Sequence, residues 1–380
     1  MPNRINQAIN TRQKETLTLN YVRQAYRLPL TKQKAQWPYR ALDWWLMLFI
    51  FCSLPACGNH SDTVVSIALH PTKPNIVYLA TDEAVYKSRD TGKSWQRFQG
   101  ALTRTRVISL AIDPELPANI FAGTNGDGTY KSPDGGRSWH QFNKGLQRGT
   151  ISAIVNQVVF HPQNSQTLYA ATTVGVFQST DGGRTWQERM SGMVEINFVV
   201  SLAIDPTRPK VIYAGTTGGV YRSKTGAKNW VKVTEGMVAF DAKMASMAMG
   251  VNSLAIDPNE TNTVYAGTTQ GLFKSTNQGN NWTKVGDALG DSYVSAIQLD
   301  PLNTTTIYLA TSQGVKKSFD GGQTWALKST GLEAASIRSI QLNTNSPNII
   351  YAGTNGGGLY RSLDGGESWT RLPLTIASEE

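Results

Sequence analysis

The chain has 380 residues, of which 40% are hydrophobic, and it contains 35 glycines and ten tryptophans. This is ample apolar material for a packed core, and the glycine content indicates many tight turns. The formal net charge is +9, but residues 1–56 carry eight of the basic side chains and only two of the acidic ones. A nucleic-acid-binding protein needs its basic residues clustered on the folded domain, so we expect no nucleic-acid partner.

Residues 1–57 have the pattern of an export signal. The stretch "WWLMLFIFCSLPA" at 44–56 is uncharged. A membrane-spanning helix needs about 20 apolar residues, whereas this shorter run fits the hydrophobic part of a secretory signal. Its end, Leu54-Pro55-Ala56-Cys57, resembles a bacterial lipobox. The resemblance implies lipidation at Cys57 and a lipoprotein on the periplasmic side of a bacterial membrane. A retained signal anchor, or an ordinary signal in which Cys57 has no role, are the alternatives.

After a short linker at 58–63, the body of the chain (64–376) is repetitive. Its tryptophans recur every 43 to 52 residues, and each closes one copy of an eight-residue motif such as "SPDGGRSW" at 132–139. The seven tryptophans are Trp95, Trp139, Trp186, Trp230, Trp282, Trp325 and Trp369.

Each repeat contains four short strand patterns. In "VVSLAIDPTRPKVIYAGTTGGVYRSKTGAKNWVKV" (199–233), strands are predicted over "SLAID", "VIYAG", "GVYRS" and the stretch that begins at the tryptophan. Turn signals separate them. Four antiparallel strands in about 45 residues are typical of a β-propeller blade. We therefore predict an all-β fold, a single monomeric seven-bladed propeller with blades at about 64–98, 107–142, 153–189, 199–233, 252–286, 295–328 and 337–372.

The eight-residue motif, Ser-x-Asp-x-Gly-x-(Ser/Thr)-Trp, resembles the Asp box of BNR-repeat propellers. Such propellers occur in sialidases, xyloglucanase-type glycoside hydrolases, sortilin-type receptors and photosystem II assembly factors. These relatives have different activities, so the resemblance implies the fold more than the function.

The Asp-box carboxylates could be catalytic acids or turn caps. We favour turn caps, because copies spread around a ring cannot converge on one substrate. The aspartate can accept hydrogen bonds from the turn, and the tryptophan can fill the space between sheets. Two copies lack the aspartate, with Thr225 and Asn277 in its place, but keep the tryptophan. The aspartates are Asp90, Asp134, Asp181, Asp320 and Asp364.

Neither a metal nor a cofactor is expected. The four histidines do not form a ligand motif, and the two cysteines lie in the leader, outside the folded body. Two of the histidines, His70 and His161, occupy the position that the aspartate of an Asp-Pro turn has after the first strand in other blades. They are therefore predicted to be turn formers.

Partner binding is expected on the face that carries the loops after the second and fourth strands, because these loops differ between blades. The stretch 234–251 is rich in methionine, which suits adaptable binding surfaces. A Cu(I) site on its thioethers is the alternative interpretation. The candidate partner-binding residues are Met237, Phe240, Met244, Met247, Met249, Glu195, Asp291 and Tyr293.

Taken together, the pattern favours a non-catalytic binding or assembly scaffold, tethered to a membrane by lipid or a signal anchor, for a protein or polysaccharide partner. The alternative is a glycoside hydrolase of the sialidase or xyloglucanase type. Such an enzyme needs two carboxylates at a defined separation, which the sequence alone does not supply.

Overall fold

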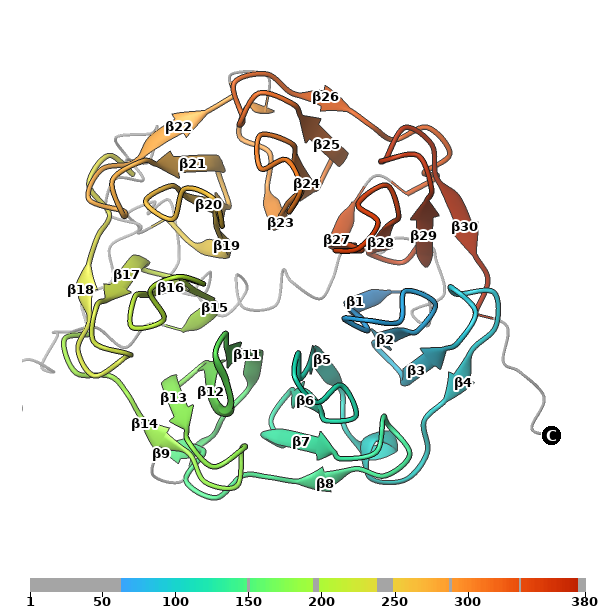
Figure 1. Cartoon of the computed structure of the whole chain (residues 1–380), viewed down its shortest axis with the longest axis vertical. Coiled ribbons are helices and arrows are strands. Elements are labelled where there is room, and N and C mark those ends of the chain that lie inside the picture. Colours follow the sequence, from blue (N-terminus) through green and yellow to red (C-terminus); the bar gives the residue numbers. More distant parts are fainter. Residues whose placement is uncertain are drawn as a thin grey trace, which may run out of the picture. The chain divides into compact units, whose positions relative to one another are not determined.

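The computed structural model describes residues 63–148, 151–193, 198–237, 249–286, 289–334 and 336–374. Seven four-stranded antiparallel sheets are arranged as the blades of a ring (Figure 1). In each sheet the spatial order of the strands follows the chain, and the first strand lies next to the central channel. The predicted seven-bladed propeller is therefore confirmed.

The strands of the first four blades recur with nearly constant length. Blade 1 has β1 (Val64–Leu69), β2 (Val77–Thr81), β3 (Val85–Ser88) and β4 (Gln96–Arg97). Blade 2 has β5 (Val107–Ile112), β6 (Ile120–Thr124), β7 (Thr129–Ser132) and β8 (His140–Gln141). Blade 3 has β11 (Val155–His161), β12 (Asn164–Thr172), β13 (Gly175–Ser179) and β14 (Gln187–Glu188). Blade 4 has β15 (Val199–Ile204), β16 (Ile212–Thr216), β17 (Gly219–Ser223) and β18 (Val231–Lys232).

The last three blades follow the same plan. Blade 5 has β19 (Val251–Ile256), β20 (Val264–Thr268), β21 (Gly271–Ser275) and β22 (Thr283–Val285). Blade 6 has β23 (Val294–Leu299), β24 (Ile307–Thr311), β25 (Gly314–Ser318) and β26 (Ala326–Leu327). Blade 7 has β27 (Ile337–Leu342), β28 (Ile350–Thr354), β29 (Leu359–Ser362) and β30 (Thr370–Leu372).

Two small elements lie between blades. A 3₁₀ turn, η2 (Gly100–Arg104), follows blade 1, and a two-stranded hairpin, β9 (Gln147–Arg148) with β10 (Ile151–Ser152), follows blade 2. No helix in the described part of the chain is long and apolar enough to span a membrane.

The second strand of each blade lies deep in the fold. In six of the blades it is a five-residue strand in which every residue is buried, such as "IYAGT" in β16 and β28. Both faces of this strand are covered by neighbouring blades, so no polar side of the usual alternation is needed. The first strand carries a β-bulge at its second residue in every blade, for example between Val64 and Ser66. Such bulges bend a strand and increase its twist.

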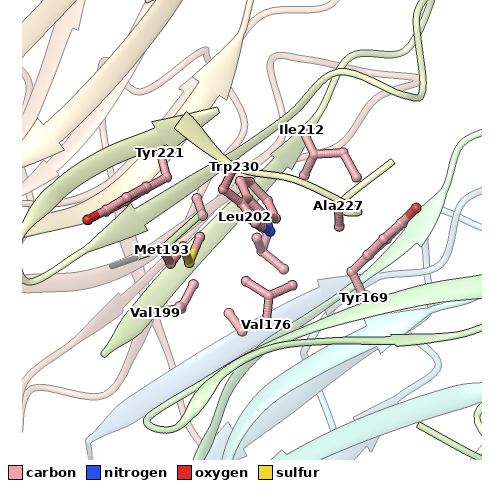
Figure 2. Close-up of a cluster of buried hydrophobic side chains, with 11 residues drawn as sticks. Tyr169, Val176, Met193, Val199, Leu202, Ile212, Tyr221, Ala227 and Trp230 are labelled. Carbon is pink, nitrogen blue, oxygen red and sulfur yellow. The ribbon is translucent and has the colours of Figure 1, made fainter. Parts of the chain in front are cut away.

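The core consists of seven similar clusters, each shared by two adjacent blades. Figure 2 shows the one between blades 3 and 4, where Trp230 of the blade-4 turn lies against Val176 of blade 3 and Leu202 of β15. Trp230 is buried, and its indole N–H donates to the carbonyl of Arg189 in blade 3 at 2.9 Å. Truncating a buried tryptophan of this kind costs about 3–5 kcal/mol.

The ring closes without strand exchange. Each of the seven blade sheets is built from four strands consecutive in the chain, and the seam between blades 7 and 1 is closed by side chains. Tyr351 and Leu359 of blade 7 share a cluster with Val64 and Trp95 of blade 1. The closing seam is therefore packed in the same way as the other six.

Candidate functional site

The Asp box is a turn held by its own side chains. In the blade-2 copy, the Asp134 carboxylate accepts hydrogen bonds from the Ser132 hydroxyl at 2.8 Å and from the Ser138 backbone N–H at 2.9 Å. The Ser138 hydroxyl also donates to it, at 2.6 Å. The backbone N–H of Gly136 donates in turn to the Ser132 hydroxyl at 2.7 Å. These contacts are the ones a turn cap makes.

The same contacts keep the box carboxylates ionised. Partial burial opposes ionisation of Asp134, but hydrogen bonds from Ser138, Ser132 and the Arg137 backbone lower its pKa to about 2. The pKa of Asp364 is lowered to about 2 chiefly by the Ser368 side chain. A general acid in glycoside hydrolysis needs a raised pKa, so these groups are poorly suited to that role. The pKa is also lowered for Asp90, Asp181 and Asp320.

The two boxes without aspartate keep the turn. In blade 4 the Thr225 hydroxyl replaces the carboxylate and accepts from the Asn229 N–H at 2.9 Å. In blade 5 the Asn277 side-chain oxygen accepts from the Ser275 hydroxyl at 2.9 Å and the Asn281 N–H at 2.9 Å. One neutral oxygen is therefore sufficient to close the turn, and the negative charge is dispensable.

Each box also joins its blade to the preceding one. The carbonyl of Gly135, the fourth residue of the blade-2 box, accepts hydrogen bonds from two blade-1 side chains, Lys87 Nζ at 2.8 Å and the Tyr78 hydroxyl at 3.2 Å. We call this arrangement the inter-blade clasp. The basic residue of the third strand is not among the site residues predicted from the sequence, although it recurs just before the box serine in six of the seven blades.

The clasp recurs around the ring. At the closing seam, the Thr91 carbonyl accepts from Arg361 at 2.8 Å and from the Tyr351 hydroxyl at 3.3 Å. In blade 3 the basic residue is replaced by Gln178, which instead donates to the Tyr169 hydroxyl at 3.0 Å. The other basic donors are Lys131 to Gly182, Arg222 to Gln278, Lys274 to Gly321 and Lys317 to Gly365.

The ring has two faces with different loops. The loops after the first and third strands lie together on one face, because the fourth residue of each box bonds to the loop after the first strand, as Gly226 N–H does to the Lys210 carbonyl at 2.9 Å. We call this the first face. The loops after the second and fourth strands lie on the second face, where Arg106 pairs with Asp82.

The loops after the first strands form compact turns. Asp113 accepts from the backbone N–H groups of Glu115 at 2.9 Å and Leu116 at 3.0 Å. His70 serves in the same way, because its Nδ1 accepts from the Lys73 N–H at 3.1 Å. Burial lowers the pKa of His70, which favours the neutral ring that can accept.

An open apolar hollow of about 370 Å³ lies at the first-face mouth of the channel, where the inner strands of blades 4, 5 and 6 end. We call it the mouth pocket. Each of the three blades contributes the same short pattern to the wall: the last, mainly aliphatic residues of the inner strand, and the proline that follows the strand. Gln298 is the one residue of the lining that has a side-chain amide. The lining consists of 202–204 and Pro206, 254–256 and Pro258, and 297–299 and Pro301.

The candidate residues on the second face are only partly within the described residues. Met249 is buried, and Met237 packs against the same cluster between blades 4 and 5, which includes Val233 and Trp282. These two thioethers thus contribute to the core of the ring. Glu195, Phe240, Met244, Met247 and the lipidation candidate Cys57 lie outside the described residues, so their roles stay predictions.

Asp291 and Tyr293 lie near the start of the inner strand of blade 6. Asp291 is well exposed and pairs with Lys284 at 2.5 Å. Burial raises the pKa of Tyr293 to about 12, so its hydroxyl stays protonated. Within the described ranges, no three or more His, Cys, Asp or Glu side chains are grouped so that they could hold a metal ion.

Known proteins with similar sequences include propellers of the kinds that the Asp-box repeat resembles. Residues 83–237 match the family model described as "Sortilin-Vps10: Sortilin, neurotensin receptor 3". A xyloglucanase from Hypocrea jecorina (strain QM6a) is 33% identical over 75 residues, which is 20% of this chain and 9% of the enzyme. The chain thus matches only a small part of this curated relative.

Solved structures show the same fold. An ancestral GH74 enzyme is similar with a TM-score of 0.63 and 21% identity, over 82% of this chain and 46% of its own. YCF48 bound to D1 peptide is similar with a TM-score of 0.60 and 16% identity, over 80% of this chain and 94% of its own. The described ring therefore corresponds to less than half of the GH74 enzyme and to nearly all of YCF48.

Proposed function

We propose that this chain, an Asp-box (BNR-repeat) β-propeller, is an exported, membrane-tethered scaffold that binds a protein partner and catalyses no reaction on it. The observation that carries the proposal is the mouth pocket, an open apolar surface on a rigid ring. Binding sites typically have concave, mostly apolar walls with a few polar groups, and loops on a rigid scaffold commonly carry them.

The box carboxylates support a binding role rather than catalysis. They are the acids that the repeat places most regularly, and their oxygens accept hydrogen bonds from their own turns. This arrangement stabilises the scaffold and leaves partner contact to the loops and the channel mouth.

The size of the ring also supports this function. YCF48, whose structure contains a bound D1 peptide, is covered over 94% of its length. A single ring of this kind is thus sufficient to hold a peptide in that protein. The GH74 enzyme is more than twice as long as the region it shares with this chain.

Site-specific photo-crosslinking in cells tests the proposal. A photoreactive residue at position 302 would probe the first face, since Leu302 is 76% exposed beside Pro301 of the mouth pocket. Position 244 would probe the methionine-rich stretch. Position 187, on the exposed outer strand β14, is the control. One dominant protein from 302 or 244, absent from 187, is expected. No specific protein from either position would refute the proposal.

The membrane tether rests on the lipobox-like sequence at Cys57. A Cys57→Ser protein should leave the membrane fraction if Cys57 carries the lipid. If Cys57→Ser protein stays with the membrane at the wild-type level, the lipid tether is wrong.

A glycoside hydrolase is the second candidate, favoured by the match to a xyloglucanase. Its test is release of reducing sugar or sialic acid by the purified chain. Loss of that release in both Glu195→Gln and Asp291→Asn proteins would support the enzyme. Asp291 is tied to Lys284, so Lys284→Met is a useful companion variant, because it frees the carboxylate while leaving it in place.

A further inference from the structure

The first-face loops of blade 4 are unusually basic. They contain four basic residues, Arg208, Lys210, Lys224 and Lys228, and their box has Thr225 where most copies have aspartate. The corresponding loops of blades 5, 6 and 7 contain acidic residues and no lysine or arginine. Charge on the first face is therefore divided between blades, with four basic residues on blade 4 and three, Lys73, Arg89 and Lys93, on blade 1.

Three of the four basic groups point to solvent. Arg208 is engaged, because it pairs with Asp205 at 2.8 Å and donates to Thr261 of blade 5 at 2.7 Å. Lys210, Lys224 and Lys228 are exposed, and among the described residues no acidic side chain is paired with them. We call these three residues the blade-4 lysines.

The blade-4 lysines adjoin the mouth pocket. Pro206 lines the pocket, and Lys210 is four residues further along the same loop, within about 14 Å of chain. The Gly226 N–H bond to the Lys210 carbonyl then holds the box turn, with Lys224 and Lys228, against this loop. The blade-4 lysines thus lie on loops that continue outward from the blade-4 wall of the mouth pocket.

We propose that this surface binds a short acidic peptide segment of the partner, with aliphatic residues in the mouth pocket and carboxylates on the blade-4 lysines. An extended peptide of about six residues spans about 20 Å, which is enough to reach from the pocket to the lysines. The inference rests on the proposed binding function and adds the partner's chemistry.

The charge pattern favours a peptide over a membrane surface. A flat anionic bilayer would meet the acidic loops of blades 5 to 7, such as the blade-5 loop with the exposed Glu260, at the same time as blade 4. A narrow peptide can follow blade 4 alone. The pocket walls are aliphatic and proline side chains rather than the aromatic faces on which sugar rings stack, so a peptide is also favoured over an acidic glycan.

Selection of a random peptide library against the full chain in detergent tests this chemistry. Enriched peptides should combine aliphatic residues with adjacent aspartate or glutamate. The binding of one enriched peptide, labelled with a fluorophore, is then measured by anisotropy. The triple variant K210Q/K224Q/K228Q should raise Kd by about tenfold. The matched triple K73Q/R89Q/K93Q, which removes the same charge from the first face of blade 1, should change it less than about twofold.

A second pair of variants tests the pocket. Ala255→Asp puts a charge into its wall, whereas Ala111→Asp makes the same change at the equivalent inner-strand position of blade 2. We expect loss of peptide binding only for Ala255→Asp, with both proteins compared by their thermal unfolding. Enriched peptides without acidic residues, or equal effects within either pair, would overturn the inference.

Two further outcomes separate the inference from the proposed function. Lysine-dependent binding to phosphatidylglycerol vesicles without peptide enrichment would assign the blade-4 lysines to a membrane and overturn the peptide. A protein crosslinked from position 302 or 244 but not from 228 would leave the binding function intact and refute this site. No crosslinked protein from any of these positions would refute both.

Discussion

Adding one methyl group at two equivalent glycines should destabilise the ring by different amounts. Gly183 and Gly366 are the fifth residues of their boxes, and both have φ of 88°. A Cβ atom at Gly366 would lie 3.4 Å from Tyr308 Cε1, an ordinary contact. A Cβ atom at Gly183 would lie 2.5 Å from Phe121 Cε1. Phe121 is buried and held by Phe160 and Lys131.

The expected losses in the free energy of unfolding of the two Gly→Ala variants follow from this geometry. A left-handed backbone costs alanine about 1–2 kcal/mol, and the stiffer unfolded chain returns about 0.4–1 kcal/mol. Gly366→Ala should therefore lose about 1 kcal/mol. Gly183→Ala adds overpacking of about 1–3 kcal/mol, for a total loss of about 2–4 kcal/mol.

Urea unfolding followed by tryptophan fluorescence measures both losses, and comparison of the slopes checks that the transitions are alike. Ala227→Gly is the natural control. Ala227 already occupies this position with φ of 66° and is buried among Tyr169 and Val176. The free energy of unfolding should change little in Ala227→Gly, because relief of backbone strain offsets the lost packing of the methyl group. Losses for the two glycines that agree within about 0.5 kcal/mol would refute the steric argument.

Three further predictions concern charge. The pKa of Asp134 is about 2 in the folded ring and near 3.9 when unfolded; its stabilisation is therefore present above about pH 4 and lost as pH falls toward 2, and Asp134→Asn should flatten that part of the Tm–pH curve. A steeper curve for the variant would contradict this. Lys87→Met removes the clasp bond to Gly135 but also the desolvation of a buried ammonium, so its net cost at pH 7 should be below about 1.5 kcal/mol, whereas Lys93→Met, at an exposed position of the same blade, should be neutral in the same unfolding assay. Burial lowers the pKa of Lys87 to about 8, so wild-type stability should gain a contribution as pH rises from about 8 to 10; if Lys87→Met retains that rise, the assignment is wrong.

Most of the fold could be predicted because the same strand patterns and the same turn motif occur seven times in the sequence. The tryptophan period and the alternation in the inner strands determine the blade count and the strand order. The neutral boxes at Thr225 and Asn277 were also interpretable, because a side-chain oxygen remains at the third position.

The inter-blade clasp and the mouth pocket could not be predicted from the sequence in the same way. Lys87 looks like a solvent-facing residue at the end of a strand, and its role depends on a carbonyl 48 residues later. Variation among the loops after the second and fourth strands favoured the second face for partner binding. The mouth pocket instead lies on the first face, where three similar loops converge around the channel. Such convergence depends on the distance between blades, which periodicity does not encode.

The inter-blade clasp makes the repeat self-complementary in every blade except blade 3. Such a blade carries a basic donor on its third strand and the acceptor in its own turn, so a duplicated segment of the gene encodes both halves of a new contact between blades. The seam between blades 7 and 1 uses this joint as well. The seam between blades 7 and 1 is therefore interchangeable with the other clasped seams. A circular permutant opened between blades 6 and 7, with the present ends linked, should rebuild the same ring.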